Sequence, residues 1–264
     1  MIDATNAVSL PRDLADLLGA GRSRLVWRNE AGGLTFEVAA APRAIFLKWV
    51  PASSGIDLVK ERERLAWAAS FISVPRIVGF GEGPDGAWLA TEAIDGDSAV
   101  SPANLDRPEL AVRAMGEGLR RLHDALPVDG CPFDWSAGAR LAQAETLHSE
   151  GRLDPSDWHV EHRVLTPQEA LARLRNIPAV DTAVVCHGDA CAPNTLLDGA
   201  GGFRAHVDLG SLGVADRWAD LAVATWSTIW NFGEGYEDAL LDAYGIDPDR
   251  ERTAYYRLLW DCAD

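Results

Sequence analysis

One compact set of side chains in this sequence is suited to chemistry: Asp189, Asn194 and Asp208. Residues 185–194, VCHGDACAPN, read as the end of a strand and a polar loop, and a second β-like run ends at Asp208. We therefore expect two polar loops that leave two neighbouring strands. One carboxylate can orient or deprotonate a hydroxyl, while an amide oxygen and a second carboxylate suit Mg²⁺. The ordered set predicts phosphoryl transfer to a hydroxyl group.

Each of these residues also has an ordinary structural role. Asp and Asn often cap helices or form turns, so any one of them alone would be read as structural. Their order at two strand ends favours the chemical reading. His187 lies in the same loop, and we expect it to form core hydrogen bonds rather than to react. None of the four Cys residues forms a C-x-x-C pair, so a zinc ribbon or redox motif is not indicated.

The elements that must position these residues fall into two parts. Residues 1–95 are rich in β-like runs with one helical segment, in the order β-β-β-α-β-β, and the helical period dominates from residue 96 to residue 264. This division predicts an α+β protein with two lobes, 1–95 and 96–264. Strands are expected at residues 24–27, 34–38, 44–50, 75–80, 87–93, 183–186 and 203–207, and helices at 57–70, 108–126, 135–149, 167–177, 216–230, 236–244 and from 250.

A single lysine on the third expected strand could neutralise phosphate groups. Lys48 and Lys60 are the two lysines in the chain, although arginine is plentiful. A lysine ammonium is a point charge, and an arginine guanidinium does not replace it. A lysine at this position in an arginine-rich chain therefore favours a role at phosphate groups. The alternative is a solvent-facing side chain.

The loop sequences resemble a known family. HGDACAPN at residues 187–194, followed by HVDLGSLGVADRWADLA at 206–222, is similar to the aminoglycoside O-phosphotransferases, above all the 3′ and 3″ enzymes. Matches at residues 74–76, 131–133 and 255–259 extend the resemblance over nearly the whole chain. It implies a protein-kinase-like fold, with a β-rich N-lobe containing one helix and a mostly helical C-lobe. It also implies phosphorylation of an aminoglycoside hydroxyl by ATP or GTP, first of the 3′ type and second of the 3″ type, and antibiotic resistance.

The resemblance assigns roles to individual residues. Asp189 would be the catalytic base, and Asn194 and Asp208 would hold Mg²⁺. Glu61 would pair with Lys48, with Glu63 as the alternative partner. The remaining nucleotide contacts would be Gly32 and Gly33 in a phosphate-covering loop, for which a plain hairpin turn is equally consistent, and the backbone C=O of Thr91 and N–H of Ala93 at adenine.

The part that would bind the acceptor departs from the family pattern. Residues 225–231, TWSTIWN, contain no acid where family members present acids to the drug. Trp226 and Trp230 lie four residues apart on one helical face, and could stack on a sugar ring or belong to the core. The acids that remain as candidate substrate contacts are Asp157, Glu161, Asp261 and the terminal Asp264.

Composition limits the class of partner. Lys and Arg number 24 against 40 Asp and Glu, for a net charge of −16, and most of the excess lies beyond residue 95. This argues against a nucleic-acid partner and permits a cationic small molecule. No apolar run reaches the ~18 residues of a membrane helix, and the first residues show no signal-peptide pattern. We therefore expect a cytoplasmic protein with no membrane partner.

Two other functions remain open from the sequence. A kinase of the same fold could act on another small alcohol, such as a different antibiotic or a metabolite, and the Trp-rich helix favours that reading. A non-catalytic binding module could keep the fold, but it would be expected to lose Asp189, Asn194, Asp208 or Lys48, and all four are present.

Overall fold

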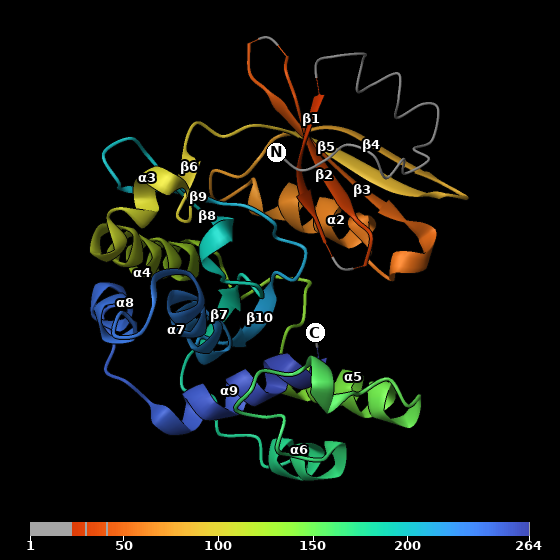
Figure 1. Ribbon diagram of the computed structural model, residues 1–264, viewed down its shortest axis with the longest axis vertical. Coiled ribbons are helices and arrows are strands. Elements are labelled where there is room, and N and C mark those ends of the chain that lie inside the picture. Colours follow the sequence, from red (N-terminus) through yellow and green to blue (C-terminus); the bar gives the residue numbers. More distant parts are fainter. Residues whose placement is uncertain (1–22, 30, 41, 264) are drawn as a thin grey trace. The chain divides into compact units, whose positions relative to one another are not determined.

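The computed structural model describes residues 23–263 apart from residues 30 and 41 (Figure 1). This part of the chain is divided into two compact units. Unit 1 contains residues 23–66 and Pro75–Ile94, and unit 2 contains Trp67–Val74 and residues 95–263. The expected order of a β-rich part followed by a helix-rich part is confirmed. Among the described residues, no helix combines the length and the apolar character needed to span a membrane.

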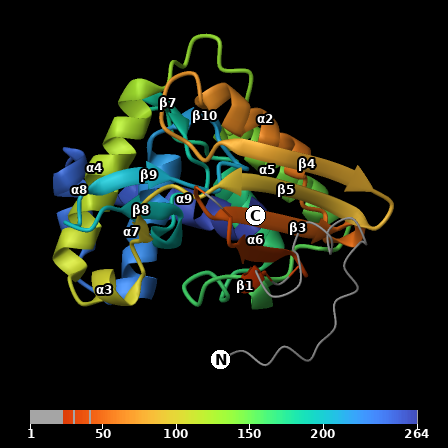
Figure 2. The ribbon, with the colours of Figure 1, turned by 90° about the horizontal axis from the view of Figure 1, so that it is seen from above.

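Unit 1 is built on one antiparallel sheet of five strands, in the spatial order β1-β2-β3-β5-β4. Figure 2 shows β3, β5 and β4 side by side in this order. Alternate residues along β2, β3 and β5 share one face, because side chains in a strand alternate between the two faces. On that face Leu34, Leu47, Trp49 and Ala90 form a buried apolar cluster. The strands are β1 (Ser23–Arg28), β2 (Leu34–Val38), β3 (Ile45–Pro51), β4 (Ile77–Gly83) and β5 (Gly86–Glu92).

Helix α2 (Leu58–Ala68) packs against the opposite face of this sheet. Asp57 caps it, since its Oδ1 accepts hydrogen bonds from the first backbone N–H groups. Leu58 and Leu65 are buried, and the Arg62 guanidinium lies 4.3 Å from the centre of the Phe80 ring. The register places Lys48 on the face that α2 covers.

Unit 2 is organised around α7 (Trp218–Phe232), which is buried from its first residue through Thr228. Helix α9 (Arg250–Ala263) packs on α5 (Ala137–Ser149), α6 (Pro167–Leu174) and α7, and α4 (Pro108–Ala125) lies beside α8 (Glu237–Tyr244) (Figure 1). Gly116 permits the α4–α8 approach, because a Cβ there would lie 2.3 Å from the Leu240 carbonyl oxygen. The shortest helices of unit 2 are α3 (Pro102–Leu105), η2 (Pro155–Asp157) and η3 (Ala192–Asn194), and unit 1 contains the short helix η1 (Ala52–Ser54).

Two small sheets in unit 2 differ from the sequence expectation. The strands that end before the two polar loops are not neighbours, because β7 pairs with β10 and β9 pairs with β8. The expectation of two neighbouring strands is therefore wrong. The strands at 183–186 and 203–207 were expected and are present as β7 and β9, but their partners β10 and β8, of four and three residues, are too short for a period-two pattern to be recognised. The sheets contain β7 (Ala183–Cys186) with β10 (Gly213–Asp216), and β6 (Asp97–Ser98), β8 (Thr195–Leu197) and β9 (Phe203–His206).

Candidate active site

The loop that follows β7 holds Asp189 in a defined orientation. The amide nitrogen of Asn194 donates to Oδ2 of Asp189 at 2.9 Å and to its backbone oxygen at 3.0 Å. The other carboxylate oxygen, Oδ1, is buried and has no hydrogen-bond partner among the described residues. Buried polar atoms are nearly always paired, so an unpaired carboxylate oxygen is an acceptor available to a further group.

His187 joins this loop to the one that follows β9. Its side chain is fully buried, its Nδ1 accepts the backbone N–H of Asp189 at 3.2 Å, and its Nε2 lies 3.0 Å from the carbonyl oxygen of Val207. The proton therefore belongs on Nε2, which donates to that carbonyl. The backbone N–H of Val207 in turn donates to the carbonyl of Asn194 at 2.9 Å. His187 thus forms the core hydrogen bonds that the sequence predicts.

Asp208 follows Val207 directly, so the two polar loops meet although their strands do not pair. Asp208 has φ 61°, the one positive φ of a non-glycine residue in the described chain. Such backbone strain gathers at functional sites. The loops also press together at Gly188, where φ is 84° and a Cβ would lie 2.2 Å from the Ser211 carbonyl oxygen. Only glycine satisfies both conditions.

The donor atoms here fit a hard divalent cation. The nitrogen of the Asn194 amide is directed at Asp189, which leaves the amide oxygen as the remaining polar atom of that side chain. Asp208, on the adjoining loop, adds a carboxylate. An amide oxygen and a carboxylate are ligands that Mg²⁺ accepts, with water and phosphate oxygens completing its octahedron.

A buried carboxylate on α7 anchors the loop that follows β7, the candidate catalytic loop of residues 187–194. Asp220 accepts the backbone N–H groups of His187 at 2.6 Å and Gly188 at 2.9 Å. It also lies 2.9 Å from Nε2 of His123, whose Nδ1 lies 2.9 Å from the Tyr244 hydroxyl. Burial is the largest effect on Asp220 and opposes its ionisation, but the hydrogen bonds from His123 and the Gly188 N–H, together with the electrostatic effect of His123 and His187, hold the pKa of this carboxyl below its usual value. The anchor therefore stays charged.

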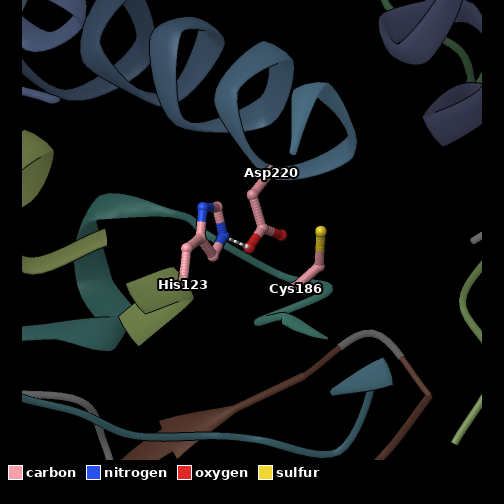
Figure 3. Close-up of side chains that lie close together, drawn as sticks. All are labelled: His123, Cys186 and Asp220. Atoms are coloured by element: carbon pink, nitrogen blue, oxygen red, sulfur yellow. Dashed lines mark hydrogen bonds and ion pairs between the residues drawn. The ribbon is translucent and has the colours of Figure 1, made fainter. Parts of the chain in front are cut away.

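Figure 3 shows His123, Cys186 and Asp220 gathered at this anchor, with candidate metal-ligand atoms within 4.8 Å of one another. All three are buried. Metal binding needs a thiolate, whereas burial raises the pKa of the Cys186 thiol well above its usual value. That thiol lies 3.4 Å from the Asp216 carbonyl oxygen, and the imidazole is held by Asp220. The cluster is accordingly a hydrogen-bond network.

In unit 1 the expected pairing of Lys48 with Glu61 is confirmed. Lys48 Nζ lies 2.8 Å from Glu61 Oε2, and Glu61 is 8 % exposed. Glu63, the alternative partner, is exposed to solvent. The pair holds the ammonium in place on β3.

The backbone groups expected at the nucleotide lie in a turn and at the end of β5 of unit 1, where the N–H groups of Gly32, Gly33 and Ala93 already donate hydrogen bonds. Gly32 and Gly33 form a turn with Asn29: the Gly32 N–H donates to the Asn29 carbonyl at 3.2 Å and the Gly33 N–H to the Asn29 side chain at 2.6 Å. Thr91 is part of β5, and the Ala93 N–H donates to the carbonyl of Ala44 at 2.9 Å. Phosphate or adenine would have to replace these bonds.

The candidate acceptor contacts differ among themselves. Asp157 and Glu161 are exposed and available to a ligand. The Asp261 side chain is only 8 % exposed, because its carboxylate accepts the backbone N–H of His159 at 3.1 Å and lies 2.5 Å from Nδ1 of His162. It fastens the 159–162 segment to α9. Asp264 lies outside the described residues.

Sequence reasoning did not single out Asp220 as a functional residue. A signal was present, since it is the one charged residue in the run Trp218–Trp226 of an otherwise apolar helix. Charged residues are almost never fully buried unless they are paired. A lone acid on such a helix therefore points to a buried partner, here the backbone of the catalytic loop.

Comparison with known proteins identifies the class that this fold and site define. The model of the phosphotransferase enzyme family matches residues 26–256. The chain belongs to this family. It is 40 % identical to an aminoglycoside 3′-phosphotransferase of Streptomyces fradiae over 83 % of this chain and 82 % of that protein. It is 37 % identical to a streptomycin 3″-kinase of Streptomyces griseus, over 91 % and 92 %.

Solved structures agree. A crystal structure of an aminoglycoside 3′-phosphotransferase of type VIII has a TM-score of 0.81 at 32 % identity, covering 95 % of this chain and 96 % of that one. An aminoglycoside 3″-phosphotransferase of Streptomyces rimosus, in complex with ADP and streptomycin, has a TM-score of 0.75 at 30 % identity, with the same coverage. These matches confirm the expected kinase-like α+β fold.

Proposed function

We propose that this protein transfers the terminal phosphate of ATP or GTP to a hydroxyl group of an aminoglycoside antibiotic and so confers resistance. The observation that carries the proposal is the unpaired Oδ1 of Asp189, held in place by Asn194 through Oδ2. Family membership and relatives named as aminoglycoside kinases support the same substrate class. We place the reaction in the cytoplasm, the compartment that supplies the nucleotide.

In this mechanism each residue has one task. Asp189 Oδ1 accepts the hydrogen bond of the acceptor hydroxyl, orients it and takes its proton as the bond to phosphorus forms. Asn194 Oδ1 and Asp208 would hold Mg²⁺, which when bound neutralises charge on the phosphates. Lys48, fixed by Glu61, adds a further positive charge for the phosphates. Asp220 keeps the His187–Gly188 backbone rigid beneath them.

A second candidate acceptor is a different small alcohol on the same fold. The observation that favours it is on α7, where Trp230 is 44 % exposed and no acid lies between Trp226 and Asn231. A screen separates the two candidates. The enzyme is incubated with Mg²⁺, ATP or GTP, and a panel of aminoglycosides, other antibiotics and simple alcohols, and mass spectrometry detects the gain of one phosphate.

We expect at least one aminoglycoside to be phosphorylated, and NMR of the product then distinguishes a 3′ from a 3″ site. Phosphorylation of uncharged alcohols without any aminoglycoside would overturn the proposed substrate class. The Asp189→Ala enzyme is the matched control for contaminating activity.

A further inference from the structure

Three aromatic rings form a stack in unit 2 that the phosphoryl-transfer chemistry does not explain. The His159 ring lies 4.4 Å from that of Trp226 and 6.3 Å from that of Trp230, centre to centre. The two Trp rings lie 5.2 Å apart, tilted by 37°. Trp226 is fully buried, whereas Trp230 is 44 % exposed. The stack is therefore anchored at one end and open to solvent at the other.

The open end lies close to the catalytic loop. The hydroxyl of Ser227 accepts the backbone N–H of Ala192, two residues before Asn194, at 2.8 Å. The side chain of Asn231 donates to the same hydroxyl at 3.1 Å. Trp230 adjoins Asn231 and lies three residues from Ser227, or about 4.5 Å along the helix axis. The part of α7 that contains Trp230 is therefore tied to the loop that contains Asp189.

One ring of the stack, that of Trp226, already contacts a cation. The Arg257 guanidinium lies 5.3 Å from the centre of the Trp226 ring, within the range of a cation–π contact. It donates to the Ala222 carbonyl at 3.3 Å and to the Thr225 hydroxyl at 3.1 Å, which fixes it beneath the stack. Trp is the aromatic side chain best suited to this interaction. Trp230 offers the same kind of ring face to solvent.

Negative charge lies near the Arg257 end of the stack, where the Glu237 carboxylate is 3.6 Å from the Arg257 guanidinium. Burial lowers the pKa of Arg257, but the charges of Glu237 and Glu161 oppose this effect, so both acids lie within electrostatic range of that guanidinium. The backbone N–H of exposed Glu161 also lies 3.4 Å from the His159 ring. The Asp261 carboxylate accepts the backbone N–H of His159 and so holds His159 in its place in the stack. A positive group is thus attracted to the region and finds an aromatic face there.

We propose that the exposed face of Trp230 is a subsite that binds one ammonium or guanidinium group of the acceptor by a cation–π contact, with Glu161 adding negative charge to the region. The proposal rests on the proposed function and makes it more specific. An aromatic side chain would then recognise a positive group of the acceptor, a task for which residues 225–231 offer no acid.

The test compares Trp230→Phe and Trp230→Leu with wild type, and Phe71→Leu is the matched control because Phe71 is an exposed aromatic residue, 45 % exposed, outside the stack. An exposed cation–π contact corresponds to about a two- to five-fold change in affinity. We expect Trp230→Leu to raise the KM for the aminoglycoside by that factor, Trp230→Phe by less, and Phe71→Leu not at all. The kcat and the nucleotide KM should stay unchanged, because a ground-state contact is lost.

Mono-N-acetylated forms of the same aminoglycoside then identify the contact, because acetylation removes one positive charge at a time. In the wild type, acetylation of the contacting amine raises KM, and in Trp230→Leu this particular penalty disappears, since coupled partners are not additive. Equal acetylation penalties in both enzymes at every amine, or an unchanged KM in Trp230→Leu, would overturn the subsite. Absence of aminoglycoside phosphorylation by the wild type would instead overturn the proposed function.

Discussion

The Asn194 amide nitrogen lies 2.9 Å from Oδ2 of Asp189, and this contact assigns different tasks to the two oxygens of one carboxylate. Oδ2 is held by the amide, while Oδ1 is buried without a hydrogen-bond partner in the described chain. The same contact turns the amide oxygen of Asn194 away from Asp189. One hydrogen bond therefore orients both the proposed base and the proposed metal ligand.

The first prediction concerns the base. Replacing Asp189 with Ala should lower kcat by roughly 10²–10⁴-fold, the usual contribution of a positioned general base. Nucleotide affinity should change little, because Asn194, Asp208 and Lys48 remain. Steady-state kinetics and nucleotide titration measure the two effects, with the exposed α4 variant Asp124→Asn as the control. Retention of more than half of the turnover would refute the role of Asp189.

The second prediction separates two neighbouring acids on α2. Glu61→Gln removes the charge that holds Lys48 Nζ at 2.8 Å, so the ammonium loses its fixed position and the KM for nucleotide should rise about ten-fold, as for a charge-assisted hydrogen bond of ~1.5 kcal/mol. Glu63→Gln changes an exposed side chain two positions along the same helix and should leave that KM unaltered. Equal effects of the two substitutions would contradict the assigned pair.

Much of this arrangement could be predicted from the sequence because the informative patterns are long. The strand that contains Lys48 and the helix that contains Glu61 both extend over enough residues for their periods to be recognised, and the pair then follows from the family resemblance. The same holds for α4, α7, α8 and α9, whose boundaries differ little from expectation. Asp189 and Asn194 were recognisable because polar residues follow a strand end at close spacing.

The features that could not be predicted depend on contacts between distant segments. Strand β10 is four residues long and is defined by its pairing with β7, so no local pattern announces it. Asp261 was expected to face a substrate because members of the family that the sequence resembles present acids from their C-terminus, yet its carboxylate is held by the segment around His162, 99 residues earlier. Sequence shows which residues are charged, and packing decides which of them meet solvent.

The third prediction concerns the close contact between the two catalytic loops. Gly188→Ala should destabilise the protein by at least about 1–3 kcal/mol, the cost of a positive φ for a residue with a Cβ. The new methyl group would also lie 2.2 Å from the Ser211 carbonyl oxygen, so activity should fall further than stability alone explains. Gly199→Ala is the control, because nothing lies within 4 Å of its added Cβ. Chemical denaturation and kcat measure both effects.

The fourth prediction distinguishes exposed acids from the buried one. Asp157→Asn and Glu161→Gln should raise the aminoglycoside KM with little effect on Tm, since their side chains are exposed. Asp261→Asn should lower Tm, because it weakens the bonds that fasten His159 and His162 to α9. Thermal unfolding and acceptor kinetics on the three variants decide the matter, and an unchanged Tm for Asp261→Asn would argue against its structural role.

The last prediction concerns acid stability and His206, which ends β9. Burial, together with the nearby His187, lowers the pKa of His206 to about 3 in the folded protein, whereas an unfolded His titrates near ~6.5. Below that pH the unfolded chain binds a proton that the folded chain does not. The contribution of His206 to the free energy of unfolding is therefore at its maximum above ~pH 6.5. It decreases by up to about 1.4 kcal/mol per pH unit as the pH drops toward the folded pKa. Urea denaturation of wild type and His206→Leu between about pH 7.5 and pH 4.5 measures this contribution as a difference in slope. The variant should lose less stability on acidification, and parallel slopes would show that His206 does not titrate as its burial requires.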